Sequence, residues 1–209
     1  MRHRSPKSKR SCYGSTVSSP ASESGTRNRT RRAILSAAAS ALARDRTATL
    51  ADIAERAEVG RSTLHRYFAD REELIRAAVV DSLAAIEASV KDAAVDFAEP
   101  LGSIRRLIAG MVEVGDRIAF LFGDPGMHQV MRDAPWAPDP EAPSVIELIR
   151  SGQRQGVFDD QVPAAWIQQV IWALTYSGWE SAERGDLPRH GVTPAVLRAF
   201  ENGVVAKTG

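Results

Sequence analysis

The stretch TLADIAERAEVGRSTLHRYF, residues 49–68, decides the fold of this chain. Its first half carries four apolar residues at helical spacing, Leu50, Ile53, Ala54 and Ala57. Residues 58–60 interrupt that spacing, and we expect a second short helix after them, with Leu64 and Phe68 on its inner side. Two short helices joined by a tight turn form a helix-turn-helix, whose second helix lies in the major groove of DNA.

The second helix of this motif has polar groups on its outer side: Arg61, Ser62, Thr63, His65, Arg66 and Tyr67. Its first turn holds backbone N–H groups without helical partners, which favour a phosphate oxygen. The first helix should begin cleanly, because Thr49 is a good N-cap and Asp52, three residues later, approximates a capping box. The motif therefore presents a surface suited to DNA.

The runs T-x-x-x-I-A-x-x-A-x-V from Thr49, S-T-L-H-R-Y-F at 62–68 and D-R-E-E-L at 70–74 resemble the TetR family of bacterial transcriptional regulators. The resemblance covers roughly residues 30–80. It implies a three-helix DNA-binding head followed by a variable, all-helical body for ligand binding and dimerisation.

Outward position and the resemblance together predict the DNA contacts. We expect major-groove contacts from Thr63, His65, Arg66 and Tyr67, and phosphate contacts from Thr49, Arg61, Ser62 and Arg71. Two positions depart from the family pattern. Glu58 stands where the family has Gly, so we expect a strained left-handed residue at about 1 kcal/mol. His65 stands where the family has Tyr, which bears on the DNA sequence that is read.

Charge is sorted by position along the chain. Residues 1–32 carry a net charge of +8, whereas the whole chain carries +1, so the remainder is acidic. Four arginines stand immediately before or on the first turns of the first expected helix, and we predict that they form an arm that touches DNA: Arg27, Arg29, Arg31 and Arg32. The Ser- and Arg-rich residues 1–26 are expected to be a disordered basic tail.

The composition is that of an ordinary soluble protein. With 209 residues, 44% of them hydrophobic, the chain can bury a sizeable core. Cys12 is the single cysteine, so no disulfide framework is implied. No apolar run approaches the length of a membrane span, and the first thirty residues lack a signal-peptide core. We expect a cytoplasmic protein without a membrane partner.

The sequence shows no catalytic or metal-binding pattern. The histidines are scattered along the chain at His3, His65, His128 and His190. This spacing does not match a metal motif such as H-E-x-x-H, and the glycine-containing turns match neither a P-loop nor a dinucleotide fingerprint. We expect no enzymatic activity, no metal and no cofactor.

Beyond the motif, the pattern is one of helices separated by Gly and Pro. Asp70 should cap a long helix that reaches about Val95, joins head to body and transmits movement between them. Residues 133–143 hold four prolines around Trp136 and should form a loop. The prediction is an all-α fold, with a helix-turn-helix DNA-binding domain at 27–73 and a helical ligand-binding and dimerisation domain at 74–209.

The helix expected from Pro163 to Glu183 is apolar on nearly every side. Such a helix must be covered on more than one side, and we expect the second cover to be another subunit. The resemblance implies a homodimer through this helix and the one that begins at Pro194, with small residues such as Gly178 admitting the partner. The alternative is the central helix of a monomeric bundle.

Aromatic and Met residues are concentrated in the body, beside a proline-rich loop that could act as a lid. We predict that a small hydrophobic or aromatic molecule binds among Met111, Phe120, Met127, Met131, Trp136, Trp172, Tyr176 and Trp179. The alternative for each of these residues is ordinary core packing.

These patterns indicate a homodimeric regulator that binds double-stranded DNA, a repressor released from its operator by a small-molecule effector. The rival interpretation is a small-molecule-binding helical protein whose helix-turn-helix is only a scaffold; a third is a purely structural dimer. The basic outer surface of the second motif helix favours DNA binding.

Overall fold

The computed structural model describes residues 20–205, and every helix or strand assigned within that range is a helix. The elements are α1 (Pro20–Arg44), α2 (Leu50–Arg56), α3 (Arg61–Tyr67), α4 (Arg71–Asp92), α5 (Pro100–Glu113), α6 (Gly115–Phe122), α7 (Met127–Arg132), α8 (Val145–Arg154), α9 (Ala164–Arg184), the 3₁₀ helix η1 (Arg189–Gly191) and α10 (Val192–Val204). The predicted all-α fold is confirmed. None of these helices is long and apolar enough to cross a membrane.

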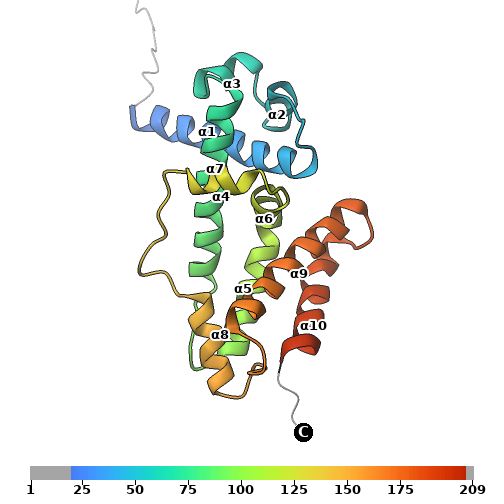
Figure 1. The fold of residues 1–209 in the computed structure, drawn as a ribbon. Coiled ribbons are helices and arrows are strands. Elements are labelled where there is room, and N and C mark those ends of the chain that lie inside the picture. Colours follow the sequence, from blue (N-terminus) through green and yellow to red (C-terminus); the bar gives the residue numbers. More distant parts are fainter. Residues whose placement is uncertain (1–19, 206–209) are drawn as a thin grey trace, which may run out of the picture.

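Helices α1, α2 and α3 gather at one end of the molecule, and α4 leads from them into a bundle of the later helices (Figure 1). We call α1–α3 the head and α4–α10 the body. The head rests on the body through α1, which packs against both α4 and α6. One apolar core runs from Ile34 in the head to Val204 in the last helix. Head and body are therefore packed as one unit.

The helix-turn-helix consists of α2 and α3. Thr49 caps α2: its Oγ1 accepts a bond from the Asp52 N–H at 3.3 Å, and the Asp52 carboxylate accepts one from the Thr49 N–H at 2.7 Å. This reciprocal pair confirms the predicted capping box. Leu64 and Phe68 are buried against the rest of the head, as their spacing predicted.

Glu58 adopts the left-handed conformation, with φ of +55°. Its backbone N–H donates to the Glu55 carbonyl at 3.0 Å, which closes the end of α2 and starts the turn toward α3. The strained turn expected at this position is therefore confirmed. Ala94 takes a similar conformation, with φ of +45°, and it ends α4 slightly before the expected Val95.

The first helix is longer than the sequence pattern suggested. We expected residues 1–26 to be a disordered tail, but residues 20–26 belong to α1, while residues 1–19 lie outside the described range. Pro20 suits the first position of a helix, where its missing N–H is not needed. The segment after it has no apolar stripe, so periodicity could not reveal it. The bond from the Thr30 hydroxyl to the Thr26 carbonyl, 3.1 Å, follows the helical repeat.

Gly178 has a different role from the one expected. A Cβ atom at this position would lie 2.8 Å from Val192 Cγ1 and 2.9 Å from Val196 Cγ2 of α10. Gly178 therefore allows α9 and α10 of the same chain to approach closely. The expectation that it admits a partner subunit is wrong, because the chain's own helix already covers it.

The proline-rich loop at 133–143 is not helical, as predicted, but it lies along α4 (Figure 1). The Asp139 N–H donates to Glu87 Oε1 at 2.7 Å, and the Asp139 carboxylate pairs with Lys91 Nζ at 2.7 Å. These bonds fasten the loop to the outer side of α4. The loop is therefore a strap on that helix and does not lie over the groove described below.

Candidate nucleic-acid interface and ligand groove

Helix α3 presents its polar side chains away from the core. Arg61, Ser62, His65 and Arg66 are exposed, and Thr63 and Tyr67 are half-buried. The Arg66 guanidinium lies 5.9 Å from the centre of the Tyr67 ring. The structure thus brings all six predicted residues of this helix together on one short element. An exposed helix with two arginines, a histidine and hydroxyl groups can bond both phosphates and base edges.

Two predicted phosphate-binding side chains already have partners inside the head. Thr49 Oγ1 donates to Asp52 Oδ2 at 2.8 Å as part of the cap. Arg71 Nη2 donates to the Arg46 carbonyl at 2.8 Å, and Arg71 Nη1 donates to the Ala48 carbonyl. Thr49 and Arg71 therefore fix the start of α2 and the connector before it.

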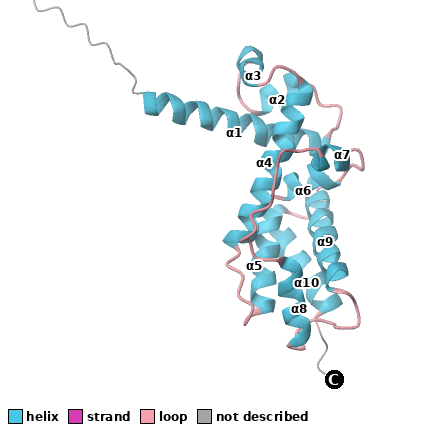
Figure 2. Cartoon of the chain, turned by 60° about the vertical axis from the view of Figure 1, so that its left-hand side comes forward, coloured by secondary structure: helices cyan, strands magenta, loops and turns pink. Residues whose placement is uncertain are grey.

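The arginines near the N-terminus lie on α1. Arg27 and Arg29 are exposed, and Arg29 Nη2 donates to Thr26 Oγ1 at 3.1 Å. The first turns of α1 project beyond the other helices (Figure 2). The Arg31 guanidinium lies 5.5 Å from the centre of the Phe68 ring, which ties α1 to the residue that ends α3. The expected basic arm is thus a rigid helical extension beside the recognition helix.

An apolar groove of about 500 Å³ lies between α6 and α9. The residues that line it are Ile118, Phe122, Gln169, Trp172, Ala173 and Tyr176. The Phe122 and Trp172 rings are 5.6 Å apart and tilted by 48°. Phe122 is 46% exposed, which is unusual for a large apolar side chain and leaves one ring open to a ligand. The phenyl ring of Phe122, the indole of Trp172, the phenol of Tyr176 and the amide of Gln169 suit a planar aromatic molecule.

The groove contains only part of the predicted ligand set. Trp172 and Tyr176 line it. Met111 and Phe120 are buried in the core, and Trp179 packs against Gly115 of α6. Met127, Met131 and Trp136 are half-buried and lie outside the groove lining. The groove residues that the prediction missed are Ile118, Phe122, Gln169 and Ala173.

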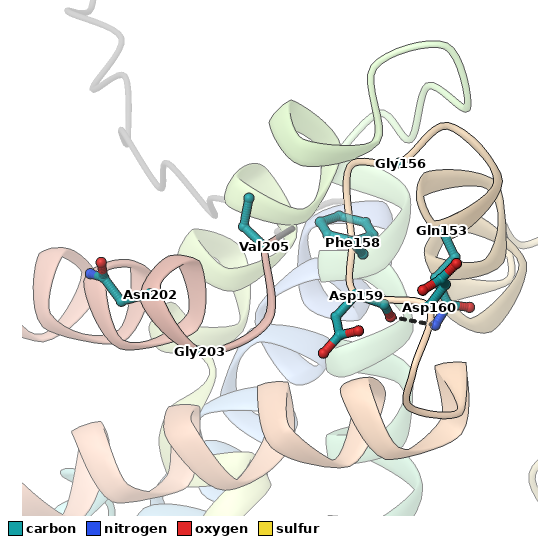
Figure 3. Close-up of a pocket in the computed structure, with 8 residues that line it drawn as sticks. All are labelled: Gln153, Gly156, Phe158, Asp159, Asp160, Asn202, Gly203 and Val205. Atoms are coloured by element: carbon teal, nitrogen blue, oxygen red, sulfur yellow. Dashed lines mark hydrogen bonds between the residues drawn. The ribbon is translucent and has the colours of Figure 1, made fainter. Parts of the chain in front are cut away.

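A second hollow, of about 510 Å³, lies at the end of the body remote from the head, between the segment after α8 and the end of α10 (Figure 3). Its walls are mainly polar and include Asp159, Asp160 and Asn202. Gln153 Nε2 donates to the Asp159 carbonyl at 2.9 Å, so this amide is bonded to another residue of the same wall. None of the predicted ligand residues lies here. The described residues also include no group of His, Cys, Asp or Glu placed to hold a metal ion.

The groove adjoins the head at Arg46, in the connector between α1 and α2. Arg46 Nη1 donates to the Phe120 carbonyl at 2.8 Å, and Nη2 donates to the Ala119 carbonyl at 2.9 Å. Burial lowers the pKa of the Arg46 guanidinium, while the nearby Asp124 and Tyr176 act in the opposite direction. A cation at the C-terminal end of α6 also interacts favourably with the helix dipole.

The body also meets the head at Glu183, near the C-terminal end of α9. Glu183 accepts bonds from Arg44 of α1, with Arg44 Nη2 at 2.9 Å from Oε1, and from Arg189 Nη2 at 2.7 Å. The Arg44 bond is the main reason that the pKa of Glu183 falls below its usual value. The carboxylate is therefore charged and held by two guanidinium groups.

An exposed recognition helix on a small head, packed on a helical body with an aromatic groove, defines a DNA-binding regulator of transcription. Residues 34–78 match the family model described as bacterial regulatory proteins, tetR family. Over 196 residues the chain is 34% identical to the HTH-type transcriptional repressor LfrR of Mycolicibacterium smegmatis, covering 90% of this chain and 97% of LfrR. The chain belongs to the TetR family of bacterial transcriptional regulators.

Two solved structures of LfrR extend the similarity to the whole fold. The structure of LfrR alone aligns with a TM-score of 0.63 at 31% identity, covering 86% of this chain and 98% of LfrR. The complex of LfrR with proflavine aligns with a TM-score of 0.58 at 30% identity, covering 86% and 99%. The regulator NfxB of Pseudomonas aeruginosa is 28% identical over 145 residues, covering 66% of this chain and 74% of NfxB.

Proposed function

We propose that the protein is a homodimeric repressor that leaves its operator when a planar aromatic molecule occupies the groove between α6 and α9. The observation that carries this proposal is the groove, in which Phe122, Trp172 and Tyr176 present aromatic rings beside the head. We assign DNA binding to residues 27–73, extended toward Pro20 by the first turns of α1, and ligand binding and dimerisation to residues 74–209.

The exposed polar side chains of α3 support its role as the recognition helix. We assign base contacts to Thr63, His65, Arg66 and Tyr67, and phosphate contacts to Arg61, Ser62, Arg27 and Arg29. Thr49 and Arg71 contribute by holding α2 at the angle that docks α3, because their side chains are already bonded within the head. The three arginines Arg27, Arg29 and Arg61 also supply the charge that attracts the duplex.

The chemistry of the groove supports a flat ligand. A planar ring system can stack against Trp172 and Phe122, while the Gln169 amide and the Tyr176 hydroxyl offer hydrogen bonds at the edges. The relative LfrR was solved with proflavine, a planar tricyclic aromatic compound, and that supports the same ligand class here. We therefore use proflavine as the probe for this groove.

An uncovered side of α9 supports a twofold dimer. Trp166, Val170 and Ser177 share one face of α9 at helical spacing, and Trp166 and Ser177 are exposed, with Trp166 47% exposed. Apolar and small residues on an exposed helix favour close packing with a second copy through α9 and α10. A twofold dimer would place two copies of α3 on half-sites about one helical turn, ~34–36 Å, apart.

Two tryptophan variants test the ligand site. Trp172→Ala removes a groove ring and should weaken proflavine binding by about tenfold, as expected for losing roughly 1.5 kcal/mol of stacking and burial. Trp136→Ala removes an equal ring from the 133–143 loop, outside the groove, and should leave the affinity within twofold. Fluorescence titration measures both affinities. If Trp136→Ala weakens proflavine binding more than Trp172→Ala does, the ligand does not bind in the groove.

The DNA assignment is tested with a labelled fragment of the gene's own upstream region. Fluorescence anisotropy should show a complex that survives an excess of unrelated duplex and dissociates when proflavine is added. A protein that fails to bind this fragment at low salt, yet binds proflavine, would favour the interpretation in which the helix-turn-helix is only a scaffold.

A further inference from the structure

We propose that residues 44–48, the last residue of α1 and the connector that leads to α2, respond to the separation of the two groove walls and so make DNA affinity depend on groove occupancy. This inference rests on the proposed function, because it concerns how a ligand in that groove changes the affinity for DNA. Its basis is a juxtaposition: Arg46 is bonded to the α6 wall, and Arg44 is bonded to the α9 wall. The tethers lie two residues apart in the chain. We call residues 44–48 the yoke.

The tether to α6 depends on the position of the last turn of that helix. The carbonyls of Ala119 and Phe120 belong to the last turn of α6, where the Gly123 N–H also donates to the Ala119 carbonyl at 3.0 Å. Arg46 donates to the Ala119 carbonyl at 2.9 Å and to the Phe120 carbonyl at 2.8 Å. Phe122, a groove residue, belongs to the same turn. A ligand that pushes Phe122 outward therefore displaces the carbonyls that hold Arg46.

The tether to α9 is a two-point bond between charged groups. Arg44 uses both Nε and Nη2 on the two oxygens of Glu183, a geometry in which direction and distance are both fixed. Glu183 lies two turns after Tyr176 on the same helix, so it moves with the second groove wall. Arg189 bonds the same carboxylate and keeps it in place.

The yoke is also fixed to the DNA-binding surface. Arg71 holds the carbonyls of Arg46 and Ala48, and Thr49, the next residue, caps α2. A hydrogen bond near 2.9 Å is largely lost once its atoms separate beyond about 3.5 Å. Widening the groove by less than an ångström therefore either breaks a tether or turns the yoke. The second outcome tilts α2 and α3 together.

This route complements the transmission expected along α4. Helix α4 connects head and body by continuity of the chain, whereas the yoke connects the head to α6 and α9, the two helices that form the groove. Arg44 and Arg46 are thus positioning residues. Neither is among the residues that line the groove, and they act through the start of α2.

The test measures how strongly proflavine and DNA oppose each other. In the parent dimer, saturating proflavine should weaken operator binding by between about 5-fold and 150-fold, the usual range of such coupling. Arg46→Met should reduce that factor below threefold, while proflavine affinity and ligand-free DNA affinity both stay within threefold of the parent. Arg46→Lys keeps the charge but cannot bond both carbonyls as a fork, so it should give an intermediate factor.

Arg105→Met is the matched control. It removes an arginine that pairs with Glu201 at 2.7 Å, between α5 and α10, far from the yoke. This variant should keep the full coupling factor. Equal coupling in the parent and Arg46→Met would overturn the proposal. Loss of ligand-free DNA binding by a folded Arg46→Met dimer would also overturn it, since Arg46 would then be needed for docking itself.

A variant that needs no ligand separates this inference from the proposed ligand class. Gln169→Trp adds an indole ring to the groove wall and should weaken operator binding at least fivefold in the parent. In the Arg46→Met background the same substitution should change binding by less than twofold, with light scattering confirming the dimer. If proflavine fails to bind the parent but this pattern holds, the ligand class is wrong and the yoke stands. Equal effects in both backgrounds would refute the yoke.

Discussion

Replacing Glu58 by Gly should stabilise the protein. Glu58 has φ of +55°, a left-handed conformation that costs a non-glycine residue about 1–2 kcal/mol. Glycine removes that strain but loses more backbone freedom on folding, which offsets roughly 0.5–1 kcal/mol. The side chain is exposed and the bond from its N–H to the Glu55 carbonyl is kept by any residue. The expected net gain is about 0.5–1 kcal/mol.

Thermal unfolding followed by circular dichroism, at one fixed protein concentration, measures this gain. A change of about 1 kcal/mol shifts Tm by roughly 2–4 °C in a chain of this size, so we expect a rise of about 1–4 °C. Glu58→Ala is the decisive control, because it removes the carboxylate but keeps the strained Cβ. Glu55→Gly, in the regular part of α2, should instead lower the stability by about 1 kcal/mol.

Comparing Glu58→Gly with Glu58→Ala separates the effect of the strained backbone conformation on stability from the effect of the carboxylate charge. If Glu58→Ala stabilises the protein as much as Glu58→Gly, the gain comes from losing the carboxylate, and the argument from φ is refuted. If both variants are less stable than the parent, the Glu58 side chain makes a favourable contribution that outweighs its strain.

Three further outcomes follow from the DNA surface and the uncovered side of α9. Arg66→Ala should weaken operator binding by about 1–3 kcal/mol and relax specificity at one base pair; unchanged affinity and specificity would remove Arg66 from the reading set. Replacing Arg27 and Arg29 together by Ala should flatten the slope of log K against log salt by about 2 units, since each phosphate contact contributes roughly 0.9; a parental slope would show that neither arginine touches DNA. Ser177→Arg should give monomers in light scattering while Ala84→Arg, on the exposed side of α4, stays dimeric; two dimers would place the interface elsewhere.

Local patterns predicted the head well because short-range chemistry determines it. The Thr49–Asp52 cap, the inward Leu64 and Phe68, and the strained Glu58 depend on neighbours within four residues, so the sequence contains the information directly. The start of α1 at Pro20 was missed for the opposite reason. Its first turns project from the head and have no apolar stripe to reveal them.

The groove depends on how distant helices pack, which periodicity does not reveal. Trp172 and Tyr176 could be nominated from their type and spacing on one helix. Phe122 becomes a groove residue only because α6 lies against α9 with that ring left exposed. Met111 has the same apolar character but is sealed in the core. The small size of Gly178 likewise suggested room for a partner helix, but α10 of the same chain packs against it. These assignments require the tertiary arrangement.

The central claim is that one molecule binds DNA and a planar aromatic ligand antagonistically, and reciprocity tests it most directly. The measurement is a thermodynamic cycle on the parent protein: operator affinity with and without saturating proflavine, and proflavine affinity with and without saturating operator. We predict that proflavine and the operator each weaken the binding of the other by the same factor, between about 5 and 150. Proflavine that binds in the groove and leaves operator affinity unchanged would contradict it.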